Sequence, residues 1–194
     1  MIYEVCELLT THLRDPQYGV AALSPSVPLP PGDPAVEEVT VVSEFEIDYL
    51  PGMPIPPAAY EKGPLVLVRR GDDVTEFSAP GNPEIVTADG RVGCSVLVLY
   101  PRQAIYTRQI ENRRLSATLR AVRASVGLWL ERIPYEERSL RGVQVVSAVA
   151  GSSLRVLSTV FALSEVDTLC GAVILELQVT DRWAELDPLA IATP

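Results

Sequence analysis

The chain has 194 residues, a length that fits one domain and can bury about 70% of the unfolded surface without a stabilising metal or disulfide. Its net charge of −9 argues against a general DNA- or RNA-binding protein, because such proteins present a basic surface to the phosphates. The sequence contains no run of eighteen apolar residues and no basic leader before an apolar segment, so we expect a soluble intracellular protein without membrane contact.

Three cysteines and a single histidine limit the metal and redox chemistry of the chain. Cys6, Cys94 and Cys170 lie among apolar residues, form no C-x-x-C pair and are odd in number, a pattern that predicts buried, reduced thiols. His12 has no aspartate or cysteine at ligand spacing, and we interpret it as a structural or surface residue.

The first predicted element is a short amphipathic helix. Apolar residues repeat at helical spacing from residue 2 to about residue 14, where Asp15-Pro16 ends the pattern. Ten prolines then crowd residues 24–34 and 51–64, and they predict a proline-rich loop or arm insertion at about residues 24–63. Between the two proline clusters, residues 39–47 alternate as a strand does.

Further strands are predicted before the centre of the chain. Residues 65–69 form a short apolar run, followed by a predicted turn at 71–73 and weaker strand patterns at 74–77 and 84–87. Residues 88–91 indicate a hairpin turn that leads into a strand from residue 92 to 100. The alternation is most regular in this last strand, where one face should hold Val92, Cys94, Val96, Val98 and Tyr100.

The second half of the sequence predicts one long helix and then more strands. The helix covers roughly residues 101–133, and strands follow at 143–149 and, after a turn at 150–153, at 154–163 as its hairpin partner. Residues 172–180 close the sheet. This order predicts an α+β fold in one domain spanning residues 1–194, a mostly antiparallel β-sheet packed by one short N-terminal helix and one long central helix.

The long helix combines a positive charge with two apolar sides. Residues 102–141 contain nine arginines against four glutamates, whereas the rest of the chain has seven basic and twenty-one acidic residues. One apolar stripe falls within about 100° of arc and is expected to face the sheet. It consists of Leu115, Leu119, Val122, Val126, Trp129 and Leu130.

A second stripe of small residues lies on the other side of this helix. Alanine is the best helix former and can be exposed there without consequence. Alternatively, small side chains allow a neighbouring subunit to approach closely, while the flanking guanidinium groups bind its carboxylates. Because opposite faces of one copy differ in sign, such a contact is head to tail and can close into a ring. The predicted subunit interface comprises Arg113, Ala117, Arg120, Ala121, Ala124 and Leu128.

No signature of catalysis or cofactor binding occurs in the sequence. G-x-S-x-G, G-x-G-x-x-G and the phosphate-binding P-loop pattern are all absent, so we expect neither an enzyme nor a bound cofactor. Glu44, Glu46 and Asp48 could hold Ca²⁺ on one strand face, but they lack the turn glycine of a calcium loop, and a solvated or interface-facing strand edge is favoured. An enzyme remains a third alternative, supported only by scattered carboxylates.

The order of elements resembles that of the tail terminator proteins of long-tailed bacteriophages and of the related head-to-tail neck proteins. The resemblance is one of pattern and covers most of residues 1–20 and 60–185. It rests on the amphipathic start Met1 to Leu13, the strand Pro64-Leu-Val-Leu-Val, the strand Cys94 to Tyr100, the helical segment Arg113 to Arg123 and the closing segment Gly171 to Trp183.

This resemblance implies a structural virion protein without catalysis. It implies a homohexameric ring at the head-proximal end of the tail tube, assembled in the host cytoplasm, which contacts the tail tube protein and the head connector or neck protein. DNA would pass through the lumen only as cargo, and an even or negative inner surface would avoid traps along its path. A neck adaptor ring is one alternative. A monomeric ligand- or peptide-binding module, with the proline-rich loops framing a groove, is another.

Overall fold

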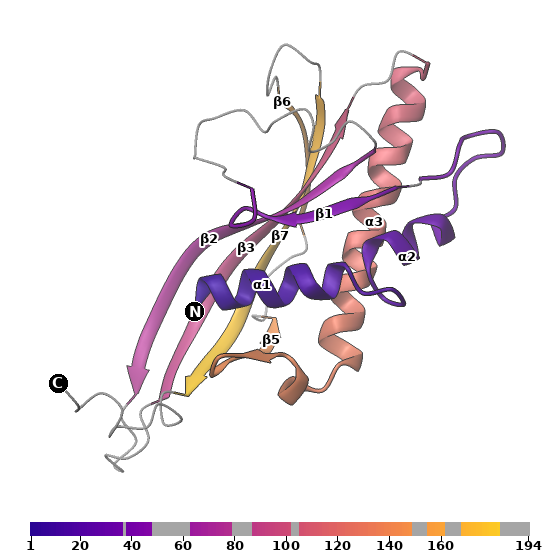
Figure 1. The fold of residues 1–194 in the computed structure, drawn as a ribbon. Coiled ribbons are helices and arrows are strands. Elements are labelled where there is room, and N and C mark those ends of the chain that lie inside the picture. The colour runs from indigo at the N-terminus through magenta and orange to yellow at the C-terminus, as the bar shows by residue number, and fades with distance from the viewer. Residues whose placement is uncertain are drawn as a thin grey trace.

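The computed structural model describes residues 1–36, 38–47, 63–78, 87–101, 105–148, 155–161 and 168–182. These residues form the predicted α+β fold, with three α-helices against a curved sheet (Figure 1). In chain order the elements are α1 (Ile2–Leu13), α2 (Val20–Leu23), the 3₁₀ turn η1 (Ser24–Ser26), β1 (Thr40–Ser43), β2 (Leu65–Ser78), β3 (Thr87–Pro101), α3 (Arg108–Arg132), the 3₁₀ turn η3 (Tyr135–Glu137), β4 (Ser139–Leu140), β5 (Val143–Ala148), β6 (Arg155–Phe161) and β7 (Thr168–Arg182).

The sheet is antiparallel except at one edge. Its strand order is β1-β2-β3-β7-β5-β4, with β6 also paired to β7, and only β1 runs parallel to its neighbour, β2. The prediction of a mostly antiparallel sheet is confirmed. The strand predicted at 39–47 is shorter than expected, because only Thr40–Ser43 pairs with β2.

The strands β5 and β6 do not form the predicted hairpin. Both pair with β7, β5 along its C-terminal half and β6 along its N-terminal half. The strands β5 and β6 therefore follow one another along the same side of β7. Their ends Ala148 and Arg155 are seven positions apart, whereas the residues of β7 that pair with them, Leu177 and Ile174, are three apart. The chain thus has four extra residues between β5 and β6. The predicted turn at 150–153 lies outside the described residues.

Two predicted turns are replaced by long strands. The predicted turn at residues 71–73 lies inside β2, at an irregularity in the pairing with β3 between Arg70 and Asp73. A Cβ atom at Gly71 would lie 2.8 Å from the carbonyl oxygen of Gly93, so the glycine allows the two strands to approach closely. Residues 88–91 also lie within a strand, β3, rather than in a hairpin turn.

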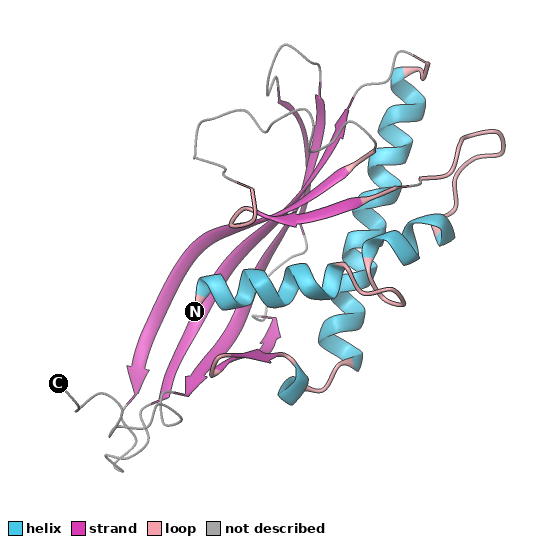
Figure 2. Cartoon of the chain, in the orientation of Figure 1, coloured by secondary structure: helices cyan, strands magenta, loops and turns pink. Residues whose placement is uncertain are grey.

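The helices α1 and α3 pack on the same face of the sheet and share one hydrophobic core (Figure 2). The alternating residues predicted for the strand at 92–100 and those of β7 are buried in this core. The helix α1 ends at Leu13, as predicted, while α3 begins at Arg108, later than predicted, because β3 extends to Pro101. The additional helix α2 was not predicted.

A smaller apolar cluster occupies the other face of the sheet. Leu65, Leu67, Leu99 and Cys170 are buried there, and Val42 and Ile47 are among the half-buried residues that pack against them. The described part of the proline-rich insertion returns to α3, because η1 contacts this helix and Val36 is buried. The helix α2, which precedes the insertion, also contacts α3. Residues 48–62 of the insertion lie outside the described residues.

Candidate subunit interface

The helix α3 begins at a capped end and buries the predicted apolar stripe. The Thr107 hydroxyl accepts a hydrogen bond from the backbone N–H of Ile110 (3.4 Å), and the helix then continues for 25 residues. It packs against β3 and β7. The predicted stripe is confirmed: Leu130 packs partly buried against the core, and the other members are buried, namely Leu115, Leu119, Val122, Val126 and Trp129.

The second stripe is only half available to another subunit. Ala117 and Ala121 are 2% and 0% exposed in the single chain, so the interface prediction is wrong for these two residues. The helix α3 is contacted by α2 and η1, and Ala121 belongs to the hydrophobic core that also includes Val20 of α2. Ala124 is exposed and Leu128 half-buried, and both remain accessible.

Arg113 binds a carboxylate of its own chain. Its Nη2 donates to Asp33 Oδ1 at 2.7 Å, and its Nε donates to Oδ2 of the same carboxylate. This bidentate hydrogen bond holds the pKa of Asp33 below its usual range. Asp33 belongs to the proline-rich insertion, so the pair fastens that segment to α3, and Arg113 already has its acidic partner within the protomer.

The middle of α3 also carries exposed arginines without such a partner. Arg120 and Arg123 are exposed, and no ion pair or hydrogen bond to them occurs within the described part of the chain. Between and beside them the surface consists largely of small or polar side chains. We call the set Arg120, Arg123, Ala124, Gly127 and Leu128 the arginine face.

Gly127 is the least expected member of the arginine face. Glycine in a helix interior costs about 1 kcal/mol relative to alanine. A Cβ atom at Gly127 would meet nothing within 4 Å, so no contact inside the chain requires a glycine here. Sequence analysis missed this residue, although a glycine inside a strong helical pattern is a recognisable signal of a packing or functional requirement.

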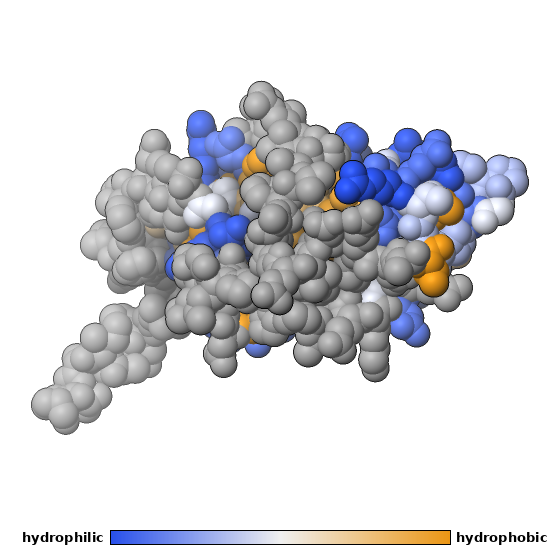
Figure 3. All heavy atoms as spheres, turned by 90° about the horizontal axis from the view of Figure 1, so that it is seen from above, coloured by the Kyte–Doolittle hydropathy of each residue, from blue (hydrophilic) through white to orange (hydrophobic). Residues whose placement is uncertain are grey.

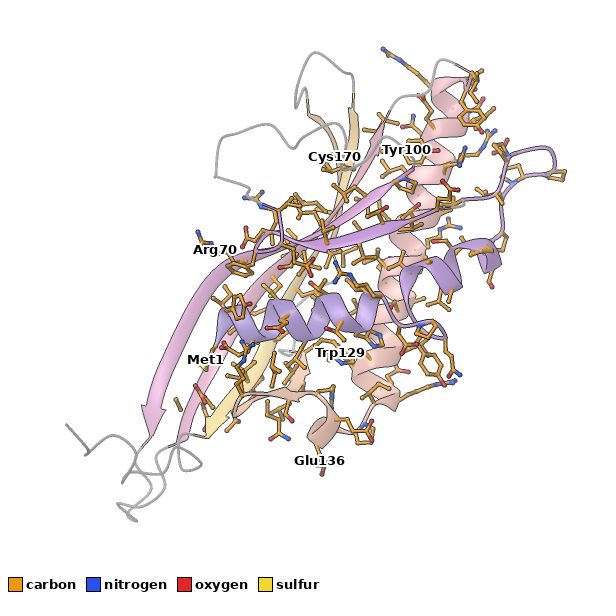
Figure 4. All side chains as sticks on the ribbon, in the orientation of Figure 1. Met1, Arg70, Tyr100, Trp129, Glu136 and Cys170 are labelled. Atoms are coloured by element: carbon orange, nitrogen blue, oxygen red, sulfur yellow. The ribbon has the colours of Figure 1, made fainter. Side chains whose placement is uncertain are left out.

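A buried polar cluster lies near the first turns of α3. The Arg114 guanidinium group is stacked near the rings of Tyr100 and Tyr106, at 5.4 and 4.8 Å, and the residue is 6% exposed. Burial raises the pKa of Tyr100 to about 12, so its hydroxyl remains protonated at neutral pH. Figure 4 shows Tyr100 beside the upper part of α3. The cluster fastens α3 to the end of β3.

The single histidine fastens α1 to α3. His12 Nε2 donates a hydrogen bond to the backbone oxygen of Ser125 (2.9 Å), and its ring stacks on the Trp129 ring with centroids 5.7 Å apart. Burial lowers the pKa of His12, because desolvation penalises the charged imidazolium. The structural role predicted for His12 is therefore confirmed.

A second exposed surface lies at the other end of α1. Tyr3 and Phe45 are 42% and 41% exposed, and their rings meet edge to face with centroids 4.9 Å apart. The Arg141 guanidinium group lies over the Tyr3 ring at 5.6 Å and pairs with Glu7 at 3.3 Å. We call Tyr3 and Phe45 the aromatic patch. Tyr3 and His12 are nine residues apart on α1, so about 14 Å along the helix separates this patch from the crossing with α3.

The two described carboxylates of the possible Ca²⁺ site, Glu44 and Glu46, pair with arginines. Glu46 accepts from Arg14 at 2.6 and 2.8 Å, which lowers the pKa of Glu46, while Glu44 lies 3.6 Å from Arg70. Asp48 lies outside the described residues. Among the residues with described side chains, no group of three or more histidine, cysteine or acidic residues could hold a metal ion.

The surface around α3 is hydrophilic in character. In the view from above, the described surface on the right, over α3 and the segment that follows α2, is mostly hydrophilic with small hydrophobic spots (Figure 3). No described helix is both long and apolar enough to cross a membrane. No protein-family model matches the sequence, and no curated protein is significantly similar to it.

Proposed function

We propose that the chain is a structural subunit of a homohexameric ring that resembles a bacteriophage tail terminator. In this proposal the ring sits in the virion between the tail tube and the head connector or neck protein, stops growth of the tube and lets DNA pass through its lumen. The proposal rests on one observation above all. The arginine face holds two guanidinium groups without an ion pair among the described residues, and a glycine that no described contact of the protomer requires.

The charge of the chain favours another copy as the partner of this face. The protein has a net charge of −9, so a second copy offers many carboxylates, whereas nucleic acid is repelled by most of the surface. A contact between copies therefore pairs unlike surfaces, and such a contact closes into a ring when the rotation between copies is suitable.

The aromatic patch is the best described candidate for the opposite half of this contact. It lies at the N-terminal end of α1, on the left of Figure 1, while α3 lies on the right. Exposed tyrosine and phenylalanine rings attract guanidinium groups through their π-electrons, and aromatic residues are enriched in protein interfaces. The proposed contact places Arg120 and Arg123 of one copy near Tyr3 and Phe45 of the next.

Two other functions remain as alternatives. A neck adaptor needs the same kind of ring and differs in its partners and symmetry. A monomeric ligand- or peptide-binding module would instead use one chain, and the proline-rich insertion would frame its groove.

The experiment measures molar mass by light scattering and symmetry by negative-stain electron microscopy. The wild type should form six-fold rings, and the double variant Arg120→Glu/Arg123→Glu should shift the protein toward monomers with an unchanged circular dichroism spectrum. Arg91→Glu/Arg108→Glu is the control, because it makes the same charge change at two other exposed positions. A wild-type monomer at tens of micromolar would exclude the ring, twelve-fold rings would favour the neck adaptor, and equal effects of the two double variants would exclude the arginine face.

A further inference from the structure

Two cysteines that are distant in sequence meet in the core. Cys6 on α1 and Cys94 on β3 are 88 positions apart, yet their sulfur atoms are 3.9 Å apart, at van der Waals contact. Both residues are at most 1% exposed. The third cysteine, Cys170, belongs to the smaller apolar cluster on the other face of the sheet, which makes it an internal reference.

The surroundings of the pair make it well suited to a covalent bond. Cys6 lies in the buried stripe of α1, and Cys94 lies in the middle of β3, held by pairing with Arg70 of β2 and Leu175 of β7. A disulfide has a sulfur–sulfur distance of about 2.05 Å, so the two atoms must approach by about 2 Å. Because β3 is paired on both sides, this approach requires a small movement of α1 toward the sheet rather than a movement of the strand.

We propose that Cys6 and Cys94 form a disulfide bond under oxidising conditions, and that this bond fastens α1 to the centre of the sheet. The oxidant is a peroxide. One thiol reacts with hydrogen peroxide to give a sulfenic acid and water, and the second thiol then displaces hydroxide from the sulfenic sulfur, giving the disulfide and a second water. Overall the two thiols lose two electrons and two protons, and one peroxide is reduced to two waters.

Access to the pair depends on brief opening of α1. This helix is held by the His12 hydrogen bond to Ser125 and by Arg14, whose Nη2 donates to the Val41 oxygen at 2.8 Å. Peroxide is small, so partial separation of the helix from the sheet admits it. Burial raises the pKa of Cys170 to about 11, which leaves little reactive thiolate, and among the described residues no other sulfur atom contacts it.

The test treats the folded wild-type protein with hydrogen peroxide and then maps its peptides by mass spectrometry without reduction. We expect the intact mass to fall by two hydrogen atoms and a linked peptide pair to contain Cys6 and Cys94. The number of thiols that react after denaturation should fall from three to one, the remaining one being Cys170. In Cys170→Ser it should fall from two to zero, whereas in Cys94→Ser both thiols should remain.

The second measurement is thermal stability before and after oxidation. Because the bond closes a long loop in the unfolded chain, the melting temperature of the wild type and of Cys170→Ser should rise on oxidation and fall back on reduction, whereas Cys94→Ser should not respond. Separate sulfinic acids at both cysteines, a link between two chains or three unreacted thiols would each overturn the proposal. None of these results depends on whether the protein forms a ring.

Discussion

Replacing Gly127 with alanine should stabilise the protomer. The residue lies five positions before the end of α3, inside a 25-residue helix, and a Cβ atom there meets open space. The new methyl group therefore costs no strain, while the unfolded chain loses conformational freedom. A gain of about 0.5–1 kcal/mol is expected, which corresponds to roughly 2–4 °C in the melting temperature for about 1 kcal/mol in a chain of this size.

The substitution Gly32→Ala is a matched control that should change the free energy of unfolding in the opposite direction. A Cβ atom at Gly32 also meets nothing within 4 Å, but this residue has a φ of +90°, which side chains other than glycine rarely adopt. Gly32→Ala should therefore destabilise the protein. Urea denaturation of both variants at a concentration where the protein is monomeric measures the two free energies of unfolding, and a destabilising Gly127→Ala would refute the reasoning.

A second substitution at Gly127 tests assembly separately from folding. Gly127→Gln adds a long side chain into space that is empty in the protomer, so the folded monomer should tolerate it. If a neighbouring copy occupies that space, sedimentation velocity should show weaker association for Gly127→Gln than for the wild type. Unchanged association together with unchanged stability would place Gly127 outside any interface.

Three further predictions concern the contacts that hold the helices on the sheet. The pKa of His12 is lowered in the folded state, so its contribution to stability is complete above the unfolded pKa of about 6.5 and is lost as the pH falls below that value. In denaturant titrations between pH 7 and 5, the variant His12→Gln should therefore lose less stability than the wild type. Tyr100→Phe removes a buried hydroxyl that has no hydrogen-bond partner within the described ranges, so the free energy of unfolding should stay equal or rise by up to about 1 kcal/mol. A clear loss of stability would contradict this environment. Gly171→Ala places a Cβ atom 2.5 Å from Leu119 Cδ1 and should cost about 1–3 kcal/mol, of which the added change Leu119→Ala should recover part in a double-mutant cycle.

Local periodicity was sufficient to predict the helices α1 and α3 and the most regular strands. The buried side of α1 and the core stripe of α3 follow the 3.6-residue repeat, and the alternating residues of β3 and β7 are buried as expected. These patterns are visible because each element buries one face and the side-chain period determines which residues lie on it.

The turns predicted at glycines were wrong where strand pairing overrides the local preference for a turn. Gly71 and the residues around Gly90 look like turns, but their strands continue because β3 is paired on both sides, with β2 and with β7. Gly71 is needed for the close approach of two backbones, a requirement that exists only once the strands are paired. No local pattern contains that information.

The covering of Ala117 and Ala121 was unpredictable for a related reason. The segment formed by α2 and η1 contacts this helix, but it is short and has no repeating apolar pattern, so nothing in it indicated that it would return to α3. The Asp33–Arg113 pair joins residues 80 positions apart. Charge alone showed that the arginines needed acceptors, but it could not show that one acceptor belonged to the same chain.

This covering limits how strongly α3 alone can hold two subunits together. The arginine face spans nine residues of α3, from Arg120 to Leu128, which is about 13 Å along the helix, so an exposed strip about 10 Å wide amounts to roughly 130 Å². A standard interface buries about 800 Å² on each partner, so the arginine face can supply less than half of that area. A ring that persists at nanomolar concentration would therefore require a second surface, and the aromatic patch is the described candidate. If both surfaces meet in one contact, Phe45→Ala and Arg120→Glu should weaken association with non-additive free energies, whereas additive effects would show that they lie in separate contacts.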